Sequence, residues 1–303
     1  MTRKTFLLFL IIILILCGCA KKESISYEYH DREVYVFEEF DYLGIHLNLE
    51  YNIAGSEKVY LVEDTKELAL LVYYNYLNNN TRTTYIMKNN KSVIWDHLYL
   101  YIYALIPDII SISDVDATSL NGRVIFLYFF TERDTNELKT VSEEIIEGIP
   151  KDSSERAKVK YIHDYLVKNA QYDMYAYNHL DDYDIYSYAS DAYAIIVNKK
   201  GMCAGYSNAM NYLLNEIGIP SLVVSSDAEN HAWNLIYIEN QWYQLDATWD
   251  DPIPDVRGRI FYTYFLKPAS NGRFADHKYD KFTNTTFDLE TYLEFGNWLL
   301  GIE

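Results

Sequence analysis

Cys203, His231 and Asp246 are the side chains of this sequence whose chemistry best fits nucleophilic catalysis. A cysteine thiolate can attack a carbonyl carbon, a histidine can carry the proton, and a carboxylate can hold the imidazole in the right tautomer. Such a set cleaves an amide through a covalent acyl intermediate. The chemistry therefore depends on whether the fold brings the three side chains together.

Cys203 is predicted to lie at the start of a helix. The segment Lys200-Gly-Met-Cys-Ala-Gly-Tyr206 leads into a helical pattern over 207–217, which a Gly-Ile-Pro sequence closes. The positive end of a helix favours the thiolate, and its N–H groups can bind an oxyanion. Gly201 and Gly205 permit close approach of backbone and substrate.

His231 and Asp246 are predicted at adjacent ends of a β-hairpin. Residues 231–238 read as a strand with alternating faces, Glu239-Asn240 signals the turn, and 241–246 form the returning strand. Since the ends of an antiparallel pair are neighbours, the carboxylate can accept a hydrogen bond from the imidazole. The hairpin thus supplies the base and the group that orients it.

A zinc site is the chemical alternative for the same residues. Structural zinc takes four ligands, often with a Cys-x-x-Cys pair, and Cys203 has neither that pair nor an evident fourth ligand. His163 and His277 are the nearby spare imidazoles, and both are expected to be structural. Asp250 and Asp251 either bind a cation of the substrate or cap a turn, with capping favoured. No metal and no cofactor is predicted.

Three motifs in this region resemble the transglutaminase-like, papain-like superfamily, and within it a branch of exported bacterial proteins. The motifs are Gly201-Met-Cys-Ala-Gly-Tyr206, Asn230-His-Ala-Trp-Asn234 and Gln241-Trp-Tyr-Gln-Leu-Asp-Ala-Thr-Trp-Asp-Asp-Pro252, with similar flanking motifs at Tyr161-Ile-His-Asp-Tyr165, Tyr172-Asp173 and Asp276-His277. The resemblance covers about residues 155–285. It implies a nucleophile at Cys203, a base at His231 and an orienting group at Asp246.

The resemblance also implies an oxyanion hole, which papain-type enzymes commonly complete with a glutamine shortly before the cysteine. Residues 195–202 contain no glutamine. The candidates for oxyanion or substrate contacts are Tyr193, Asn198, Gly201, Trp233 and Trp249.

The remaining pattern predicts a mixed fold. Helices are expected over 65–77, 93–105, 134–146, 155–169 and 192–197, strands over 33–40, 83–87, 109–112 and 123–131 with a turn at Asn121-Gly122, and a surface loop lining a cleft over 172–191. We therefore expect an α+β chain: a papain-like core over 151–303, with the cysteine helix packed on an antiparallel sheet bearing His and Asp, preceded by a smaller α+β domain over 33–150.

The first residues have the composition of an export signal. Met1–Lys4 is basic, Phe6–Leu16 is apolar and too short to span a bilayer comfortably, and small residues follow. Leu16-Cys-Gly-Cys19 resembles the lipobox of bacterial lipoproteins. That resemblance implies a signal peptide over 1–18, a lipid on Cys19, a tether over 19–32, and a mature protein anchored to the cell membrane outside the cytoplasm.

Charge and cysteine content limit the partners. Loss of 1–18 removes two of the 26 basic residues and none of the 44 acidic ones, which leaves a net charge near −20. Such a surface repels phosphate backbones, so nucleic acid is excluded as a partner. Cys203 would be the one thiol left unmodified, and no disulfide could form within the mature chain.

These observations predict a thiol enzyme that cleaves or transfers an amide-linked acyl group at the cell surface, on a peptide, protein or cell-wall substrate. The alternative is a catalytically silent lipoprotein that binds peptides or glycans in the same cleft. Pocket shape decides between substrates, and the sequence alone does not give it.

Overall fold

The computed structural model describes most of the chain. The described residues are 27–29, 32–42, 45–54, 57–78, 80–106, 111–114, 121–127, 135–226, 229–251, 253–256, 258–271, 274, 277, 281–282, 285–286 and 289–302. The predicted signal peptide over 1–18 and the predicted lipidation site at Cys19 lie outside them. Within the described part, no helix has the length and apolar character that crossing a membrane requires.

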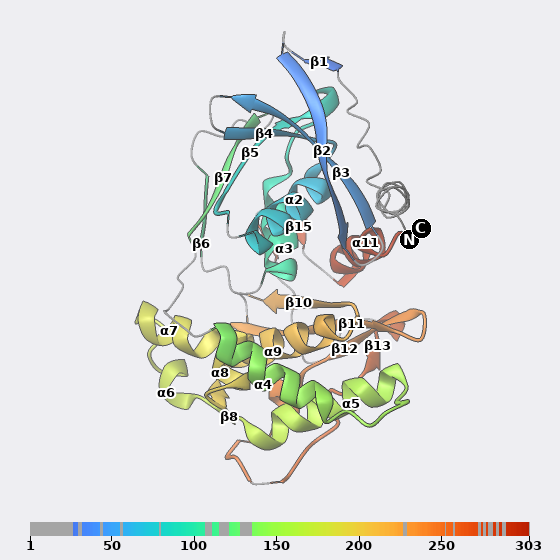
Figure 1. Ribbon diagram of the computed structural model, residues 1–303. Coiled ribbons are helices and arrows are strands. Elements are labelled where there is room, and N and C mark those ends of the chain that lie inside the picture. Colours follow the sequence, from blue (N-terminus) through green and yellow to red (C-terminus); the bar gives the residue numbers. More distant parts are fainter. Residues whose placement is uncertain are drawn as a thin grey trace, which may run out of the picture.

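One curved, seven-stranded sheet occupies the first part of the chain (Figure 1). Its strands are β1 (Tyr27–Tyr29), β2 (Arg32–Tyr42), β3 (Ile45–Ala54), β4 (Glu57–Val62), β5 (Arg82–Met87), β6 (Ser111–Asp114) and β7 (Asn121–Leu127), in the order β1-β2-β3-β4-β5-β7-β6. Strands β4 and β5 are parallel and the other neighbours are antiparallel. The short strand β1 lies within the predicted tether.

The turn predicted at Asn121-Gly122 is wrong. Both residues belong to β7, where they pair with Ile86 and Tyr85 of β5. Local turn propensity is overridden here because β5 offers hydrogen-bonding groups that only an extended partner can satisfy. The strands predicted over 33–40 and 83–87 are confirmed as parts of β2 and β5.

Helix α2 (Thr65–Leu77) covers this sheet together with α3 (Trp95–Leu105). Its predicted bounds are confirmed to the residue, since the Asp64 carboxylate caps the first turn by accepting from the Lys66 and Glu67 N–H groups. The helix predicted over 93–105 begins two residues later than expected. A 3₁₀ turn, η1 (Lys88–Asn90), leads toward it.

The second part of the chain forms a helical layer on a four-stranded antiparallel sheet, in the order β10-β11-β12-β13. The helices are α4 (Thr135–Glu147), α5 (Glu155–Asn169), α6 (Met174–Tyr177), α7 (Tyr183–Ser190), α8 (Ala192–Ile196), α9 (Cys203–Glu216), α10 (Ala247–Asp250) and α11 (Leu289–Leu299), with η2 (Ala269–Asn271). The strands are β8 (Gln171–Tyr172), β9 (Lys200–Gly201), β10 (Ser221–Ser226), β11 (His231–Ile238), β12 (Gln241–Leu245), β13 (Lys267–Pro268), β14 (Lys281–Phe282) and β15 (Thr285–Thr286).

The surface loop predicted over 172–191 is instead mostly helical. Asp173 accepts from the Tyr175 and Ala176 N–H groups at the start of α6, and Asp182 accepts from the Ile185 N–H at the start of α7. These capping aspartates outweigh the lack of long apolar periodicity, because each helix is too short to show a period.

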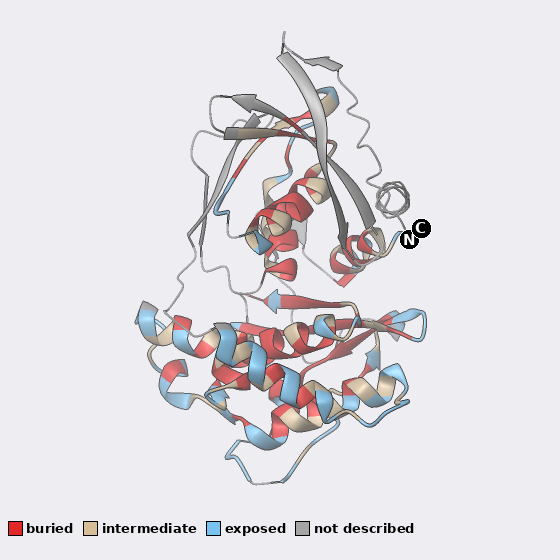
Figure 2. Ribbon diagram, in the orientation of Figure 1, coloured by how far each residue is buried: buried red, intermediate tan, exposed pale blue. Residues whose placement is uncertain are grey.

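The central sheet is buried on both faces, so the alternation predicted for 231–238 is wrong. Every residue of β11 is buried except the half-buried Tyr237. Helix α9 packs on one face, while α2, α3 and α11 lie between this sheet and the seven-stranded one (Figures 1 and 2). A strand enclosed from both sides has no solvent face to show an alternating pattern.

Helix α11 packs directly on the hairpin that carries the candidate site. The Trp242 indole N–H donates to Asn297 Oδ1 at 2.8 Å, and Phe295 stacks on Tyr101 of α3 with ring centroids 4.1 Å apart. Gly296 faces Trp242 so closely that a Cβ there would lie 2.5 Å from a ring carbon. One hydrophobic core therefore draws residues from both parts of the chain.

Gly296→Ala tests this packing by the sign of its effect. Alanine normally stabilises a helix interior by about 0.5–1 kcal/mol relative to glycine. Here we expect destabilisation of about 1–3 kcal/mol, because Trp242 must move. Denaturant unfolding would measure it, with Glu290→Ala on the exposed face of α11 as the control. A more stable Gly296→Ala protein would contradict the described contact.

Candidate functional site

Cys203 is the first residue of α9, as the sequence predicted. Met202 occupies the N-cap position without a side-chain capping bond, so the first N–H groups of the helix point toward the thiol's surroundings. The thiol lies 3.8 Å from the carbonyl oxygen of Asn230, immediately before His231. Cys203 itself is only 9% exposed.

A second contact fixes the cysteine helix against the histidine strand. The Asn234 side chain on β11 donates to the Ser207 carbonyl of α9 at 2.9 Å, and the Ser207 hydroxyl donates to the Cys203 carbonyl at 2.8 Å. All these groups are buried, so the bonds carry more weight than they would at the surface. The Asn in the second motif thus sets the distance between the nucleophile and the base.

His231 and Asp246 meet as the hairpin prediction requires. Glu239 and Asn240 both have positive φ, as a tight hairpin turn demands, and β11 pairs with β12 from Asn234–Leu245 to the turn. His231 Nε2 lies 2.6 Å from Asp246 Oδ2. The other ring nitrogen, Nδ1, is left to serve the thiol.

The second carboxylate oxygen of Asp246 caps the short helix α10. Oδ1 accepts from the Thr248 N–H at 2.9 Å and from the Trp249 N–H at 3.1 Å. The Asp-Ala-Thr-Trp sequence therefore does two things: it ends β12 with an N-cap residue and holds the carboxylate plane with two backbone bonds. Asp246 is fully buried, so its orientation depends on these partners.

The pair is an ion pair at neutral pH. Burial lowers the pKa of His231. The charge of Asp246 and the hydrogen bonds with Asp246 and Cys203 outweigh this effect and raise the pKa to about 10. Burial would raise the pKa of Asp246, yet the charge and hydrogen bonds of His231 lower it to about 2, with His277 contributing. Imidazolium and carboxylate therefore coexist across the physiological range.

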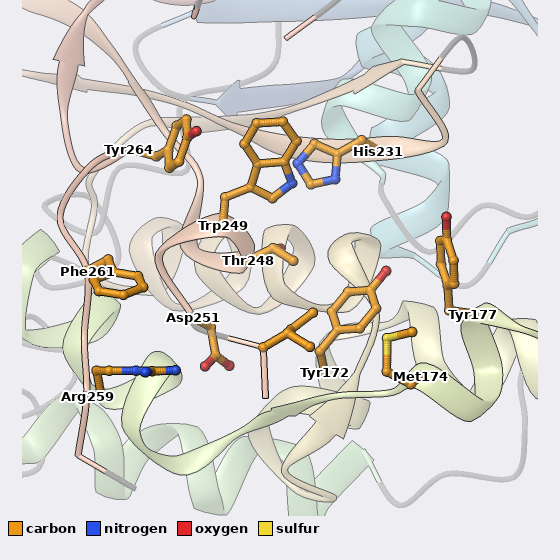
Figure 3. A pocket seen from close by; sticks show the side chains of 11 residues that line it. Tyr172, Met174, Tyr177, His231, Thr248, Trp249, Asp251, Arg259, Phe261 and Tyr264 are labelled. Carbon is orange, nitrogen blue, oxygen red and sulfur yellow. The ribbon is translucent and has the colours of Figure 1, made fainter. Parts of the chain in front are cut away.

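A pocket of about 710 Å³ opens beside His231 (Figure 3). The lining residues are Tyr172, Met174, Tyr177, His231, Thr248, Trp249, Asp251, Ile253, Arg259, Phe261 and Tyr264. Cys203 lies next to His231 and Tyr172 rather than in the pocket wall. The walls are largely aromatic, and Trp249 stacks on the His231 ring with centroids 5.1 Å apart. The predicted cleft beside 172–191 is confirmed.

Tyr172 is the functional residue that sequence reasoning missed. It ends β8, which pairs in parallel with β9 at Gly201, and in Figure 3 its hydroxyl points toward His231. Burial raises the pKa of Tyr172, and the neighbouring Cys203 raises it further by its charge and a hydrogen bond. A protonated phenol beside the nucleophile can donate to an oxyanion. Its place in the Tyr172-Asp173 motif was the available signal.

The tentative substrate and oxyanion residues lie in different places in the structure. Trp249 lines the pocket. Trp233 is fully buried behind His231, so a direct substrate contact is wrong. Tyr193 donates to Glu137 of α4, and Asn198 is exposed after α8, so neither lines the described pocket. A Cβ at Gly201 would lie 2.8 Å from the Ala189 carbonyl, which explains this glycine by packing.

Three side chains here also have the composition of a metal site. Ligand atoms of His231, Asp246 and His277 all lie within 4.8 Å of one another. However, Nε2 of each ring lies 2.6 and 3.0 Å from the same oxygen, Asp246 Oδ2. Ligands of one zinc ion, at about 2.0–2.2 Å from it, stand farther apart than 2.6 Å. These contacts are hydrogen bonds.

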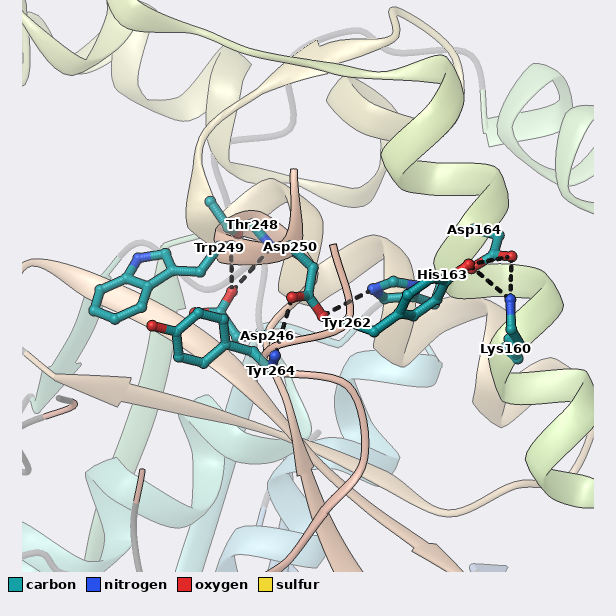
Figure 4. A network of polar contacts seen from close by, with 9 residues as sticks. All are labelled: Lys160, His163, Asp164, Asp246, Thr248, Trp249, Asp250, Tyr262 and Tyr264. Atoms are coloured by element: carbon teal, nitrogen blue, oxygen red, sulfur yellow. Dashed lines mark hydrogen bonds and ion pairs between the residues drawn. The ribbon is translucent and has the colours of Figure 1, made fainter. Parts of the chain in front are cut away.

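A second buried histidine–aspartate pair supports the turn after Asp246 (Figure 4). His163 of α5 lies 3.3 Å from Asp250 Oδ2 and 3.1 Å from Asp164 Oδ1. Asp250 Oδ1 accepts from the Tyr264 N–H at 3.0 Å. The structural role expected for His163 fits this position, since it holds α10 against α5.

Comparison with known proteins places this region in a family. A model of the transglutaminase-like superfamily matches residues 139–247. This stretch of the chain resembles the core of the transglutaminase-like superfamily. No curated protein matches. The fold is α+β, with a transglutaminase-like core over the matched residues.

Three solved structures that are similar to this chain are distant from it in sequence. A TGase shares 19% identity over 72% of this chain and 66% of its own, with a TM-score of 0.41. A candidate cysteine protease from Cytophaga hutchinsonii shares 15% identity over 51% of this chain and 66% of its own, with a TM-score of 0.29. A candidate protease from Parabacteroides distasonis shares 11% identity over 54% and 39%, with a TM-score of 0.27. This chain thus matches less than two thirds of each.

The ion pair predicts the alkylation behaviour of Cys203. With His231 protonated up to about pH 10, iodoacetamide should react with wild-type Cys203 rapidly at pH 7. His231→Ala should slow the reaction at pH 7 by about 10- to 100-fold and make it rise with pH, because the thiolate loses its cation. Mass spectrometry of the Cys203 peptide would give the rates. His179→Ala, at a half-buried histidine that does not line the pocket, should match the wild type; equal profiles for both variants would contradict the pairing.

Proposed function

We propose that this protein cleaves or transfers acyl groups at amide bonds through a thioester on Cys203. The observation that carries the proposal is the 2.6 Å contact between His231 and Asp246, formed beside a cysteine at a helix start. A nucleophile, a base and an orienting group in this relation are what covalent acyl transfer requires.

The chemistry divides into two steps. The Cys203 thiolate attacks the carbonyl carbon, the C–N bond breaks, and imidazolium Nδ1 of His231 gives its proton to the leaving amine. Water or a second amine then attacks the thioester, neutral His231 takes the proton of that nucleophile, and the thiolate leaves. Asp246 stays ionised throughout and keeps the Nε2–H tautomer of His231 in place.

Two donors are available for the oxyanion in each step. The N–H of Cys203 lies at the open start of α9, and Tyr172 presents a hydroxyl that burial keeps protonated. Donors of this kind typically contribute about 10²–10³ in rate. Tyr172 fills the role for which the sequence offered no glutamine.

The substrate we propose is a peptide or protein, including a peptide of the cell wall. The pocket beside His231 is wide enough for a side chain and is walled by exposed aromatic residues, which suits an extended chain. We also propose that lipidation of Cys19 anchors the protein to the outer face of the cell membrane, as the Leu-Cys-Gly-Cys sequence suggests.

The second candidate function is binding without turnover. The low exposure of Cys203 favours it, since the pocket can be filled by a peptide or glycan that never reaches the thiol. Covalent trapping separates the two functions, because only an enzyme forms a thioester.

Asp246→Asn tests the catalytic proposal most directly. The wild type, incubated with a peptide and cell-wall fragment library, should gain an acyl mass on Cys203. Asp246→Asn should form this adduct about 10²–10⁴ times more slowly, because the amide no longer fixes the tautomer or stabilises the imidazolium. Quenched mass spectrometry would follow the adduct.

Two controls accompany this measurement. Asp181→Asn removes an exposed carboxylate from the turn between α6 and α7 and should trap at the wild-type rate. Circular dichroism should show that Asp246→Asn is folded. An unchanged trapping rate in Asp246→Asn would remove Asp246 from the mechanism, and wild-type protein that binds fragments without any adduct would favour the binding function.

The anchor is tested by a pair of cysteine variants. Cys19→Ala should accumulate as an unprocessed precursor without lipid, because the modified sulfur is gone. Cys17→Ala should still be cleaved and lipidated, since its thiol belongs to the discarded segment. Detergent partitioning and intact-mass measurement would report both outcomes. A lipid-modified, cleaved Cys19→Ala protein would refute the anchor at this residue.

A further inference from the structure

The Asp246 carboxylate has one partner more than a catalytic triad needs. Oδ1 accepts two backbone N–H groups, and Oδ2 is contacted both by His231 Nε2 at 2.6 Å and by His277 Nε2 at 3.0 Å. Both imidazoles therefore reach the same oxygen. His277 comes from the chain that follows β13, far from the hairpin in sequence.

His277 is held at this position by aromatic packing. It is fully buried, with its ring 4.2 Å from Trp249 and 4.7 Å from Trp233, measured between centroids. Phe274, Tyr264 and His231 complete the contacts at 4.7, 5.6 and 5.4 Å. Among these neighbours the titratable groups are Asp246, His231 and Tyr264, and Asp246 is the one anion.

The chemistry of the contact fixes the direction of the hydrogen bond. An ionised carboxylate can only accept, so Nε2 of both histidines must carry a proton. Two N–H donors on one oxygen compete for its electron density. Each bond is weaker than it would be alone, and the carboxylate is stabilised in its ionised form.

We propose that His277 is a positioning residue, which holds Asp246 by its Nε2–H and limits how strongly that carboxylate retains the proton of His231. The proposal rests on the function proposed above, in which His231 must release a proton to the leaving amine and later take one up. An imidazolium bound too tightly by its carboxylate would do neither step well. His277 divides the carboxylate's hydrogen-bonding capacity between two rings.

Two substitutions distinguish a donor role of His277 from a role in ring packing alone. His277→Phe keeps an aromatic ring between Trp233 and Trp249 but removes the donor. His277→Gln removes the ring and places a neutral N–H donor at similar reach. If His277 only fills space, Phe should replace it better; if it donates to Asp246, Gln should.

The test is an NMR titration of His231 in the full chain with labelled histidine. In the wild type, two ring N–H protons bonded to Asp246 should be observed, one from each histidine. In His277→Phe, the second signal disappears, and the titration of His231 moves up by about one pH unit because Asp246 now bonds it alone. His277→Gln should restore the wild-type titration within a few tenths of a unit.

The outcomes are separable from those of catalysis, since the titration needs no substrate. A His231 titration that is the same in wild type and His277→Phe would overturn the proposal, as would rescue by Phe and not Gln. If His277→Phe does not fold, absence of the His277 Nε2–H signal in the wild type overturns it equally. If His277→Phe loses acyl trapping while its His231 titration stays at the wild-type value, the positioning role is refuted and the proposed function is left intact.

Discussion

A buried carboxylate determines how this structure is arranged around its candidate site. Removing an ionised Asp246 from water costs several kcal/mol unless hydrogen bonds and an opposite charge replace the lost hydration. Four donors do so here: two backbone N–H groups of α10 and two imidazoles. They come from three parts of the fold: the turn after β12 supplies both N–H groups, and the start of β11 and the chain beyond β13 supply one imidazole each. The burial of one acid therefore couples three separate segments.

The sheet that presents this acid is enclosed by packed helices on both sides. Helix α9 brings the thiol on one face, and α2, α3 and α11 cover the other, so every residue of β11 is buried except the half-buried Tyr237. A close-packed interior transmits small shifts, and nucleophile and base tolerate little misplacement. The seven-stranded sheet and its helices can thus support chemistry without contributing a residue to the site.

The sequence predicted best where a feature is local. The apolar spacing over 65–77 predicted the bounds of α2, and Glu239-Asn240 predicted the hairpin that joins His231 to Asp246. Prediction from the sequence failed for residues whose position depends on packing between distant segments. Trp233 sits in a polar-looking motif yet is buried by helices from elsewhere, and His277 meets Asp246 only through tertiary folding. Neither relation has a period or spacing that a linear pattern could reveal.

The two acids that follow the triad show why burial, rather than residue type, assigns a role. Asp250 and Asp251 could have formed a cation-binding pair for substrate. Instead Asp250 is fully buried against His163, and Asp251 accepts a hydrogen bond from the Tyr206 phenol of α9. Burial raises the pKa of Asp251 to about 6 despite that bond. Through these contacts the two acids hold the turn against α5 and α9. The position of this turn keeps Trp249 stacked on His231. Asp250 and Asp251 therefore shape the pocket by holding this turn in place.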